Sequence, residues 1–464
     1  MKVLKRIFKA LAWLAAGLLA LIMLLYLAVL AINWHDRPPS EEALRFAAAY
    51  RDRPAVADAD NAFVYATGFF VKPGDDPQAA GVRRIAWMRE AVKDPATATF
   101  QPPEKDYDYR SARSAAVRAI SEACGDPNAG CFAAMEHGSA ALSEWDSSER
   151  WLFDRYLALI SHPGWLEISP VDSRMLLPPY GAVMDGQKLL FVQAWMRAGE
   201  KDAPAVRSLL SQDIRFWRHT LESSDILITK MIAIAALKRH FKLGNLVLRR
   251  LPADLESAGR PPEWSAEITL AERSMKRTWV GEWMYLTRVL EQGKSRELWA
   301  DSQTQKLTLR RWQHVAVPLL QTQDLSNQWA ETFARANPEL DVPFEQYPAG
   351  VARAEVILSG SSRGGLPAFR IYNPVGAILR WISGAEHANY SKRVVDIEGV
   401  RRLALLTSEL RSRGNSAAQI PAGLSTSVIR DPYTGEPFGW DAQKSALTFK
   451  GLERLPRGLH ELVF

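Results

Sequence analysis

The feature that most constrains this chain is an uninterrupted apolar run near its N-terminus. Residues 10–32 read ALAWLAAGLLALIMLLYLAVLAI and contain no charged side chain. A helix of these 23 residues would be about 35 Å long, and the hydrocarbon core of a bilayer is about 30 Å thick. The run therefore predicts a transmembrane helix, and the rest of the chain must fold as a body tethered to a membrane.

The charges that flank the run predict its orientation. Four basic residues and no acidic residue precede it: Lys2, Lys5, Arg6 and Lys9. Cations close to a spanning helix favour the cytoplasmic side, so we expect residues 1–9 in the cytoplasm and the body outside. The alternative is a signal peptide cleaved after residues 29–31 (Val-Leu-Ala), but the apolar part of a signal peptide has about 7 to 15 residues and this run is longer.

The composition of the body is typical of a folded protein and argues against nucleic-acid binding. The chain has 464 residues, of which 47% are hydrophobic and 24% are charged, which is ordinary for a globular protein. The net charge is +6, but without the four leading cations 54 basic residues face 52 acidic ones. A nucleic-acid binder needs a concentrated basic face. We therefore expect no nucleic-acid partner.

The two cysteines, Cys124 and Cys131, enclose a turn-forming sequence. The residues between them are Gly-Asp-Pro-Asn-Ala-Gly, which lets the chain fold back and bring the sulfur atoms together. In an oxidising compartment the pair would form a disulfide; the alternative is two separate core thiols. Two ligands are too few for a zinc site, and the eight histidines show no ligand spacing. We therefore expect no metal and no cofactor.

The spacing of apolar residues predicts a mainly α-helical body. Asp202 and Pro204 mark the start of one helix, and apolar side chains then recur in steps of three and four at Val206, Leu209, Leu210, Ile214, Trp217 and Leu221. One neighbouring helix ends at Gly199 and another begins at Ser224. Further helices are expected over residues 41–50, 83–92, 110–123, 132–142, 263–291, 374–382 and 392–413. Consecutive antiparallel helices with short links predict a helical-hairpin bundle or a solenoid-like body.

Two further segments bear on the domain organisation. Prolines and glycines become frequent from residue 337, and the turn at residues 431–437 precedes a predicted β-hairpin of residues 438–441 and 446–450. The sequence thus predicts four parts: a cytoplasmic segment 1–9, a transmembrane helix 10–32, a helical ectodomain 33–336, and a C-terminal helical subdomain 337–464 that ends in the hairpin. Residues 61–71 fit either a short strand or a buried helix, and the 16 tryptophans are expected mostly in the core.

One catalytic motif can be tested. Residues 360–364 (Gly-Ser-Ser-Arg-Gly) match the G-x-S-x-G nucleophile elbow, with Ser362 as the nucleophile and residues 356–358 as the preceding strand. The elbow requires a helix directly after the serine, whereas Gly364, Gly365 and Pro367 follow. We therefore interpret the motif as a flexible loop and assign no catalytic residue.

Two parts of the chain resemble a group of bacterial proteins. Residues 202–251, with Phe-Trp-Arg at 216–218 and Lys-Met-Ile-Ala at 230–233, resemble uncharacterised single-pass membrane-anchored envelope proteins with a helical ectodomain. The end of the chain is similar to the same group, through residues 372–376 (Tyr-Asn-Pro-Val-Gly), 401–410 and 431–438. The resemblance implies a bacterial inner-membrane protein with a periplasmic domain, and it carries over no catalytic residue because the group has no assigned activity.

The sequence therefore predicts a periplasmic helical protein anchored in the inner membrane, and three functions fit it. The first is a non-enzymatic interaction or scaffold module that binds other envelope proteins. The alternative is an envelope hydrolase that acts on cell-wall or lipid material with acids from distant positions. A third option is an immunity or inhibitor protein that guards the envelope.

Overall fold

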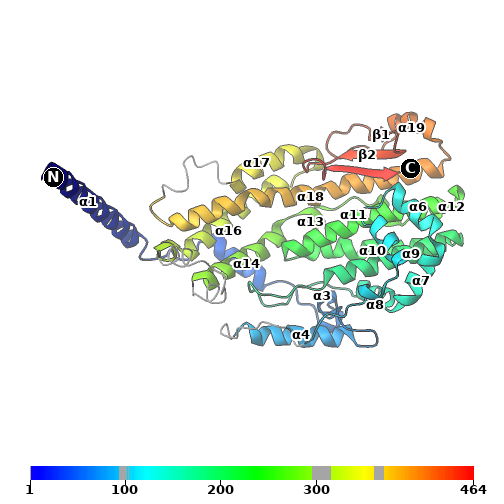
Figure 1. Ribbon diagram of the computed structural model, residues 1–464. Coiled ribbons are helices and arrows are strands. Elements are labelled where there is room, and N and C mark those ends of the chain that lie inside the picture. Colours follow the sequence, from blue (N-terminus) through cyan, green and yellow to red (C-terminus); the bar gives the residue numbers. More distant parts are fainter. Residues whose placement is uncertain (1, 94–101, 103, 295–314, 360–369) are drawn as a thin grey trace.

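The computed structural model describes residues 2–93, 102, 104–294, 315–359 and 370–464. The body is mainly α-helical, as predicted, with a small antiparallel sheet near the C-terminus. One helix, α1 (Lys2–Ile32), projects from one end of the body (Figure 1). Its segment Arg6–Ile32 has a mean hydropathy of 2.7 and no buried part, so α1 is long and apolar enough to span a membrane.

Four long helices form the centre of the body. They are α9 (Tyr180–Gly199), α10 (Ala203–Ser223), α11 (Leu227–Arg250) and α18 (Pro374–Ser412). Helix α11 packs against the other three, which explains why it is apolar on several sides. The predicted cap of α10 is confirmed, because the Asp202 side chain accepts the Ala205 N–H at 3.0 Å. The antiparallel neighbours α9, α10 and α11 have short links, as the sequence predicted.

Shorter helices cover this centre on both sides (Figure 1). The N-terminal ones are α2 (Glu41–Arg51), α3 (Ala62–Thr67), α4 (Pro77–Ala91), α5 (Ala115–Ala123), α6 (Ala129–His137), α7 (Ser139–Ser148) and α8 (Arg150–Ile160). The later ones are α12 (Ala253–Gly259), α13 (Leu270–Arg273), α14 (Lys276–Lys294), α16 (Thr322–Leu340), α17 (Tyr347–Ser359) and α19 (Ile420–Thr426). Residues 61–71, left open between strand and helix, thus contain the buried helix α3.

Several predicted boundaries are wrong. Residues 263–291 are not one helix but a 3-10 turn (Pro262–Ser265) followed by α13 and α14. A capping box of Thr269 and Glu272 starts α13, and Ser274 is extended and ends it. Residues 132–142 divide into α6 and α7 at Gly138, whereas residues 374–382 and 392–413 belong to one helix of 39 residues, α18.

The predicted hairpin is confirmed and extended. Strands β1 (Gly439–Asp441) and β2 (Ala446–Lys450) pair antiparallel, and a third strand, β3 (Leu459–Val463), pairs with β2. Strand β3 was not predicted from the sequence. Helix α18 contacts both β2 and β3, so the sheet is stabilised by packing on a helix, as a small isolated sheet in water must be.

One large hydrophobic core extends from Ala43 to Val463 among the described residues, and a small second cluster contains Phe70, Val71 and Ala80. The largest fully buried side chains include five tryptophans, as the core interpretation predicted: Trp145, Trp195, Trp217, Trp264 and Trp279. The predicted boundary at residue 337 lies inside α16, and the division of the body into two parts stays a prediction.

Candidate functional site

The connection between α1 and the body is a network of buried amides. Asn33, directly after α1, is 3% exposed. Its Nδ2 donates to the carbonyls of Val29 and Ile371, each at 2.8 Å. Its Oδ1 accepts the Asn373 N–H at 2.7 Å, and its carbonyl accepts Gln321 Nε2 at 2.5 Å. The end of α1 is thus bonded to segments that lie about 290 and 340 residues later.

Asn373 is the second centre of this network, and it caps α18. Its backbone is left-handed, with φ of 50°, a region that asparagine tolerates better than most residues. Its Oδ1 accepts the N–H groups of Gln321 and Gly376, each at 3.0 Å. Its Nδ2 donates to the Gln321 carbonyl at 2.9 Å and to the Asp324 carboxylate at 2.8 Å. The starts of α16 and α18 are therefore held together by one side chain.

The linker between α1 and α2 is bonded to α16 at several further positions. The Asp36 carboxylate accepts the N–H groups of Gln323 at 2.8 Å and Asp324 at 3.0 Å, at a helix N-terminus, where negative charge is stabilised. The Asn327 side chain accepts the Ser40 N–H and donates to the Pro38 carbonyl, each at 2.9 Å. We call the contacts of Asn33, Asp36, Gln321, Asn327 and Asn373 the joint. Because hydrogen bonds recur from α1 to α2, the joint fixes the direction in which α1 leaves the body.

Large apolar side chains are exposed around the joint. Four of them lie in the second and third turns of α18: Ile378, Leu379, Trp381 and Ile382. The side chains of Trp381 and Ile382 are 62% and 63% exposed. Ile371, whose carbonyl Asn33 binds, and Trp34 are exposed as well. We call these six residues the apolar face. It lies directly beside the end of a helix that is itself apolar and exposed.

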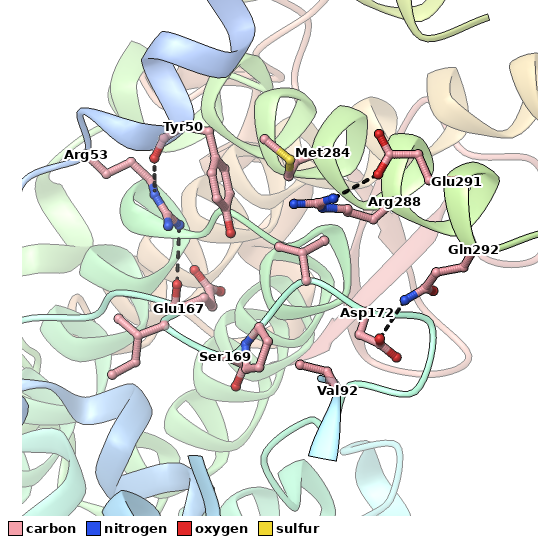
Figure 2. Close-up of a pocket in the computed structure, with 13 residues that line it drawn as sticks. Tyr50, Arg53, Val92, Glu167, Ser169, Asp172, Met284, Arg288, Glu291 and Gln292 are labelled. Carbon is pink, nitrogen blue, oxygen red and sulfur yellow. Dashed lines mark hydrogen bonds and ion pairs between the residues drawn. The ribbon is translucent and has the colours of Figure 1, made fainter. Parts of the chain in front are cut away.

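A cavity of about 600 Å³ opens between α2, residues 161–179 and the second half of α14 (Figure 2). Glu167 lies in its wall and is 2% exposed. The Glu167 Oε2 accepts the Asp225 N–H at 2.9 Å. Burial, and then the negative charge of Asp225, raise the pKa of Glu167 to about 7.

Arginines neutralise Asp225 but not Glu167. Arg53 donates to Asp225 Oδ2 at 2.5 Å and lies 3.7 Å over the ring of Tyr50, and Arg277 donates to Asp225 Oδ1 at 2.8 Å. Within the part of the chain that the structure describes, Glu167 forms no ion pair. Arg53 reaches only the Glu167 carbonyl, at 3.3 Å. The unpaired carboxyl is therefore the group in this cavity that is poised to hold a proton near neutral pH.

The second buried carboxyl group of the cavity behaves in the opposite way. Asp172 accepts the Arg174 N–H at 2.8 Å, Arg174 Nε at 3.0 Å and Gln292 Nε2 at 2.5 Å. Burial alone would raise the pKa of Asp172, but the hydrogen bonds from Arg174 and Gln292 outweigh burial and lower it. One cavity thus holds a carboxyl group that binds a proton readily and another that stays ionised, a contrast found where acid and base roles are divided.

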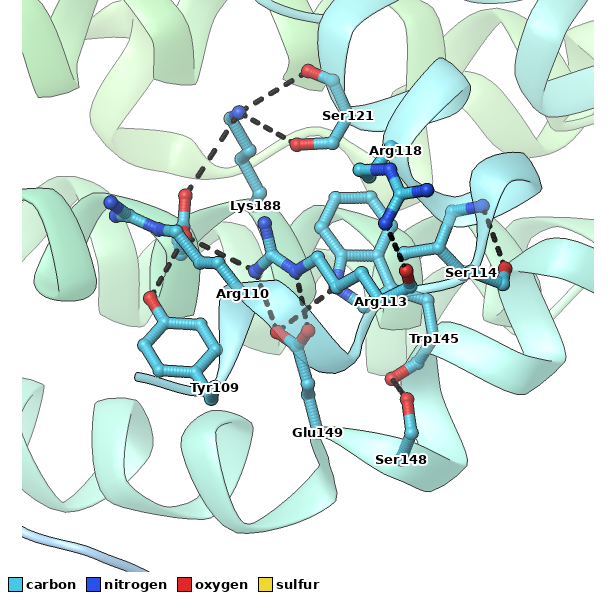
Figure 3. Close-up of polar contacts among 12 residues, drawn as sticks. Tyr109, Arg110, Arg113, Ser114, Arg118, Ser121, Trp145, Ser148, Glu149 and Lys188 are labelled. Atoms are coloured by element: carbon cyan, nitrogen blue, oxygen red, sulfur yellow. Dashed lines mark hydrogen bonds and ion pairs between the residues drawn. The ribbon is translucent and has the colours of Figure 1, made fainter. Parts of the chain in front are cut away.

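A separate charged cluster fastens the N-terminal helices to α9 (Figure 3). Asp185 of α9 accepts Tyr109 Oη at 2.8 Å, Arg110 Nε at 2.7 Å and an Arg113 guanidinium nitrogen at 3.1 Å. Arg113 also pairs with Glu149 at 2.5 Å. Burial opposes ionisation of Asp185, but the arginines outweigh it and lower its pKa. All of these charges are matched, so we assign this cluster to folding.

The predicted disulfide residues lie together beside this region. The sulfur atoms of Cys124 and Cys131 are 2.02 Å apart, at the end of α5 and in the first turn of α6. The G-x-S-x-G stretch at residues 360–364 lies outside the described residues, but residues 356–358 before it belong to helix α17 and not to a strand. Within the described ranges, no group of His, Cys, Asp and Glu residues could hold a metal ion.

Comparisons with known proteins assign no function to this chain. No protein-family model, no curated protein sequence and no solved structure matches the chain. The resemblance to membrane-anchored envelope proteins stays a prediction. Neither the joint nor Glu167 was predicted from the sequence. For the joint, two sequence features could have indicated it: the single amide Asn33 at the end of the apolar run and the Asn-Pro pair at residues 373–374.

Proposed function

We propose that this chain is a single-pass protein of the bacterial inner membrane whose body is a rigid periplasmic scaffold for other envelope proteins. In this proposal α1 spans the bilayer and residues 1–9 lie in the cytoplasm. The observation that carries the proposal is the joint, because it gives the body one fixed direction relative to the spanning helix.

The physical chemistry of the joint favours a scaffold over a simple tether. A protein that only has to stay at the membrane can use a flexible linker, and a polar linker of a few residues allows many orientations. Here the Asn33 and Asn373 amides are buried and bonded. Opening the joint would leave buried polar groups unpaired, and each such group costs about 1 to 3 kcal/mol. A body with a defined height and angle above the bilayer suits the assembly of partners that also sit in the membrane.

The apolar face supports the same orientation. Trp381 and Ile382 are on the exposed side of α18 at its start, close to the joint. Side chains of this kind on one side of a helix favour the headgroup region of a bilayer, and tryptophan is enriched there. We propose that this face rests on the outer surface of the membrane that α1 crosses.

Two experiments test the proposal. A reporter fused after Phe464 should be active on the periplasmic side; activity on the cytosolic side alone would refute the orientation. Crosslinking in intact membranes, followed by purification, should give a stoichiometric envelope partner with the wild-type chain. Asn373→Ala, which removes four hydrogen bonds of the joint, should reduce the yield of that partner, whereas Gln443→Ala, which alters an exposed amide between β1 and β2, should not. An equal yield with Asn373→Ala would show that rigidity is not needed.

The cavity of Glu167 and Asp172 favours a second candidate, an envelope hydrolase that acts on cell-wall or lipid material. Glu167 would act as a general acid, because its pKa of about 7 lies near the working pH. Glu167→Gln should abolish release of products from purified envelope material. Glu291→Gln alters an exposed carboxyl group at the rim that pairs with Arg288 and should leave the activity unchanged. Equal activity of the wild type and Glu167→Gln would exclude this role.

A further inference from the structure

A second cavity, of about 650 Å³, lies where three distant segments of the chain meet. They are the turn of residues 125–127 inside the Cys124–Cys131 loop, the middle of α11, and the C-terminal segment with β3. Figure 1 shows α6 and the C-terminus at the end of the body away from α1. This cavity therefore belongs neither to the joint nor to the cavity of Glu167.

Cations dominate the lining of this cavity. Five basic side chains and two carboxylates line it: Lys238, Arg239, Lys242, Arg393, Arg457, Glu453 and Asp126. The three residues from α11 lie on one side of that helix, because they are one, three and four positions apart. With histidine counted as neutral, the lining carries a net charge of +3.

Part of this positive charge is compensated within the protein. Glu453 is shared, since it lies 3.4 Å from Lys238 Nζ and 2.8 Å from Arg393 Nε. Lys242 pairs with Asp126 at 2.7 Å, but the Asp126 side chain is 79% exposed. An ion pair with such an exposed partner is weak, so Lys242 can exchange Asp126 for another anion.

Two arginines have no carboxylate partner among the described residues. Arg239 reaches only neutral oxygens, the Met184 carbonyl at 3.3 Å and Gln187 Oε1 at 3.5 Å. Arg457 forms no ion pair in the described part of the chain and is exposed at the mouth. Burial lowers the pKa of Arg239, and it also lowers that of Lys238. Arg239 is thus kept partly out of water without an ion pair, although the carboxylates of Asp185 and Asp213 are near enough to stabilise its charge.

An unpaired ring nitrogen adds a polar group to the same wall. His460 of β3 is 4% exposed, and its Nε2 has no hydrogen-bond partner among the described atoms. Nε2 is directed toward the Asp396 carboxylate, whose Oδ2 is 3.9 Å away. His460 Nε2 therefore faces Asp396 without a hydrogen bond of normal length, and the groups that indicate a ligand are the two arginines without a carboxylate partner.

We propose that this cavity binds a soluble anion that carries a phosphate group, with Arg239 and Arg457 as its main contacts. Guanidinium groups bind phosphate oxygens in pairs, and such charge-assisted hydrogen bonds are strong. A net charge of +3 fits a phosphate ester or pyrophosphate better than a single carboxylate. The volume lies in the usual range of small-molecule sites and exceeds what inorganic phosphate alone would fill.

The position of the cavity favours a dissolved molecule over a lipid headgroup in the membrane. Arg393 lies 19 residues after Pro374, where α18 begins beside the joint. At about 1.5 Å per residue this separation is about 28 Å along the helix. The cavity is therefore separated along α18 from the end of α1 and from the headgroups there.

The test is calorimetric titration of the full chain in detergent, with its disulfide intact, against sodium pyrophosphate at low ionic strength. We expect saturable binding of one pyrophosphate per chain that weakens as salt is added. Arg239→Gln and Arg457→Gln should each raise the Kd by about tenfold or more, the effect of losing one charge-assisted contact. Arg207→Gln removes an exposed arginine of α10 outside the cavity and should leave the Kd unchanged.

Three results would overturn the proposal. The first is no saturable binding at millimolar pyrophosphate, and the second is an equal Kd for Arg457→Gln and Arg207→Gln. Arg457 is exposed, so this comparison holds even if Arg239→Gln fails to fold. The third is binding to vesicles that contain phosphatidic acid without binding to pyrophosphate, which would assign the cavity to a lipid headgroup. None of these outcomes depends on whether the body is a scaffold.

Discussion

Asn373→Ala should loosen the attachment of α1, because the Asn373 side chain holds together the starts of α16 and α18, the two segments to which Asn33 is bonded. The side chain makes four hydrogen bonds, to Gln321 N and O, Gly376 N and the Asp324 carboxylate. At about 1 kcal/mol for each bond, their loss amounts to about 4 kcal/mol. Alanine is also strained at a φ of 50°, which adds about 1 kcal/mol. Asn373→Gly loses the same bonds without this strain, so it should destabilise the joint by about 1 kcal/mol less than alanine does.

A spin-label distance measurement reads out the joint directly. Cysteines can be introduced at Ala28 of α1 and Glu331 of α16, which are both exposed. Because Cys124 and Cys131 are bonded to each other, the new cysteines are the ones that take the label. In nanodiscs, the otherwise unchanged chain should give one narrow distance distribution between the two labels. Asn373→Ala should give a broad one, because α1 then samples many directions.

A control variant and a check of folding accompany this measurement. Gln443→Ala alters an exposed amide far along the chain and should keep the narrow distribution. Circular dichroism of each variant checks that the helical body persists. A folded Asn373→Ala chain with an unchanged narrow distribution would refute the reasoning, because another contact would then hold α1. If Asn373→Ala does not fold, Asn373→Gly serves for the same measurement.

Three other predictions test the buried carboxyl, the apolar face and the disulfide. Because the pKa of Glu167 is raised from 4.5 to about 7, the native state keeps a proton that the unfolded chain loses between these pH values. Stability should therefore fall by about 3 kcal/mol as pH rises through this window, and urea unfolding of Glu167→Gln at pH 5 and 7.5 should show a smaller fall than the wild type. An environment-sensitive dye on Trp381→Cys should shift to the blue in proteoliposomes, whereas the same dye on Val428→Cys, at a position that is 94% exposed, should report water; equal spectra would place the apolar face away from lipid. Reduction of Cys124–Cys131 should lower the free energy of unfolding by about 2.5 kcal/mol, from the entropy of a loop of eight residues, and a thiol assay on the unreduced, denatured protein should find no free thiol.

The helices were predictable where one side of each is buried. In α10 most apolar positions that predicted the helix, such as Val206, Leu210 and Trp217, are fully buried, and Leu209 is partly buried. The same periodicity misled at residues 263–291, because Trp264 and Ile268 are buried from a 3-10 turn and a loop with nearly helical spacing. The capping box at Thr269, a local side-chain interaction, determines where the new helix α13 begins.

The joint could not be predicted from the sequence because its members are ordinary residues far apart. Asn33, Gln321 and Asn373 are separated by up to 340 residues, and a single amide in a sequence is usually on the surface. The same holds for Glu167, whose pKa is raised first by burial and then by the charge of Asp225, 58 residues later. Periodicity reports the side of a helix that is buried, but it contains no information about which polar groups meet across the core.

The described polar clusters differ in whether their charged groups are paired within the protein, and this difference separates structural from ligand-binding roles. The Asp185 carboxylate accepts hydrogen bonds from arginines and from a tyrosine hydroxyl. In the joint, both the oxygen and the nitrogen of the Asn373 side-chain amide are hydrogen-bonded. Such closed networks stabilise one arrangement of the chain. The cavity of Arg239 and Arg457 is different, because within the described residues these two arginines have no carboxylate partner, and the cavity lies at the end of the body away from α1. A rigid body that holds an open anion site at a set distance from the membrane could make the binding of its partners depend on a dissolved phosphate compound. Partner yield in the crosslinking experiment should then change when pyrophosphate is added to the wild type, but not when it is added to Arg457→Gln.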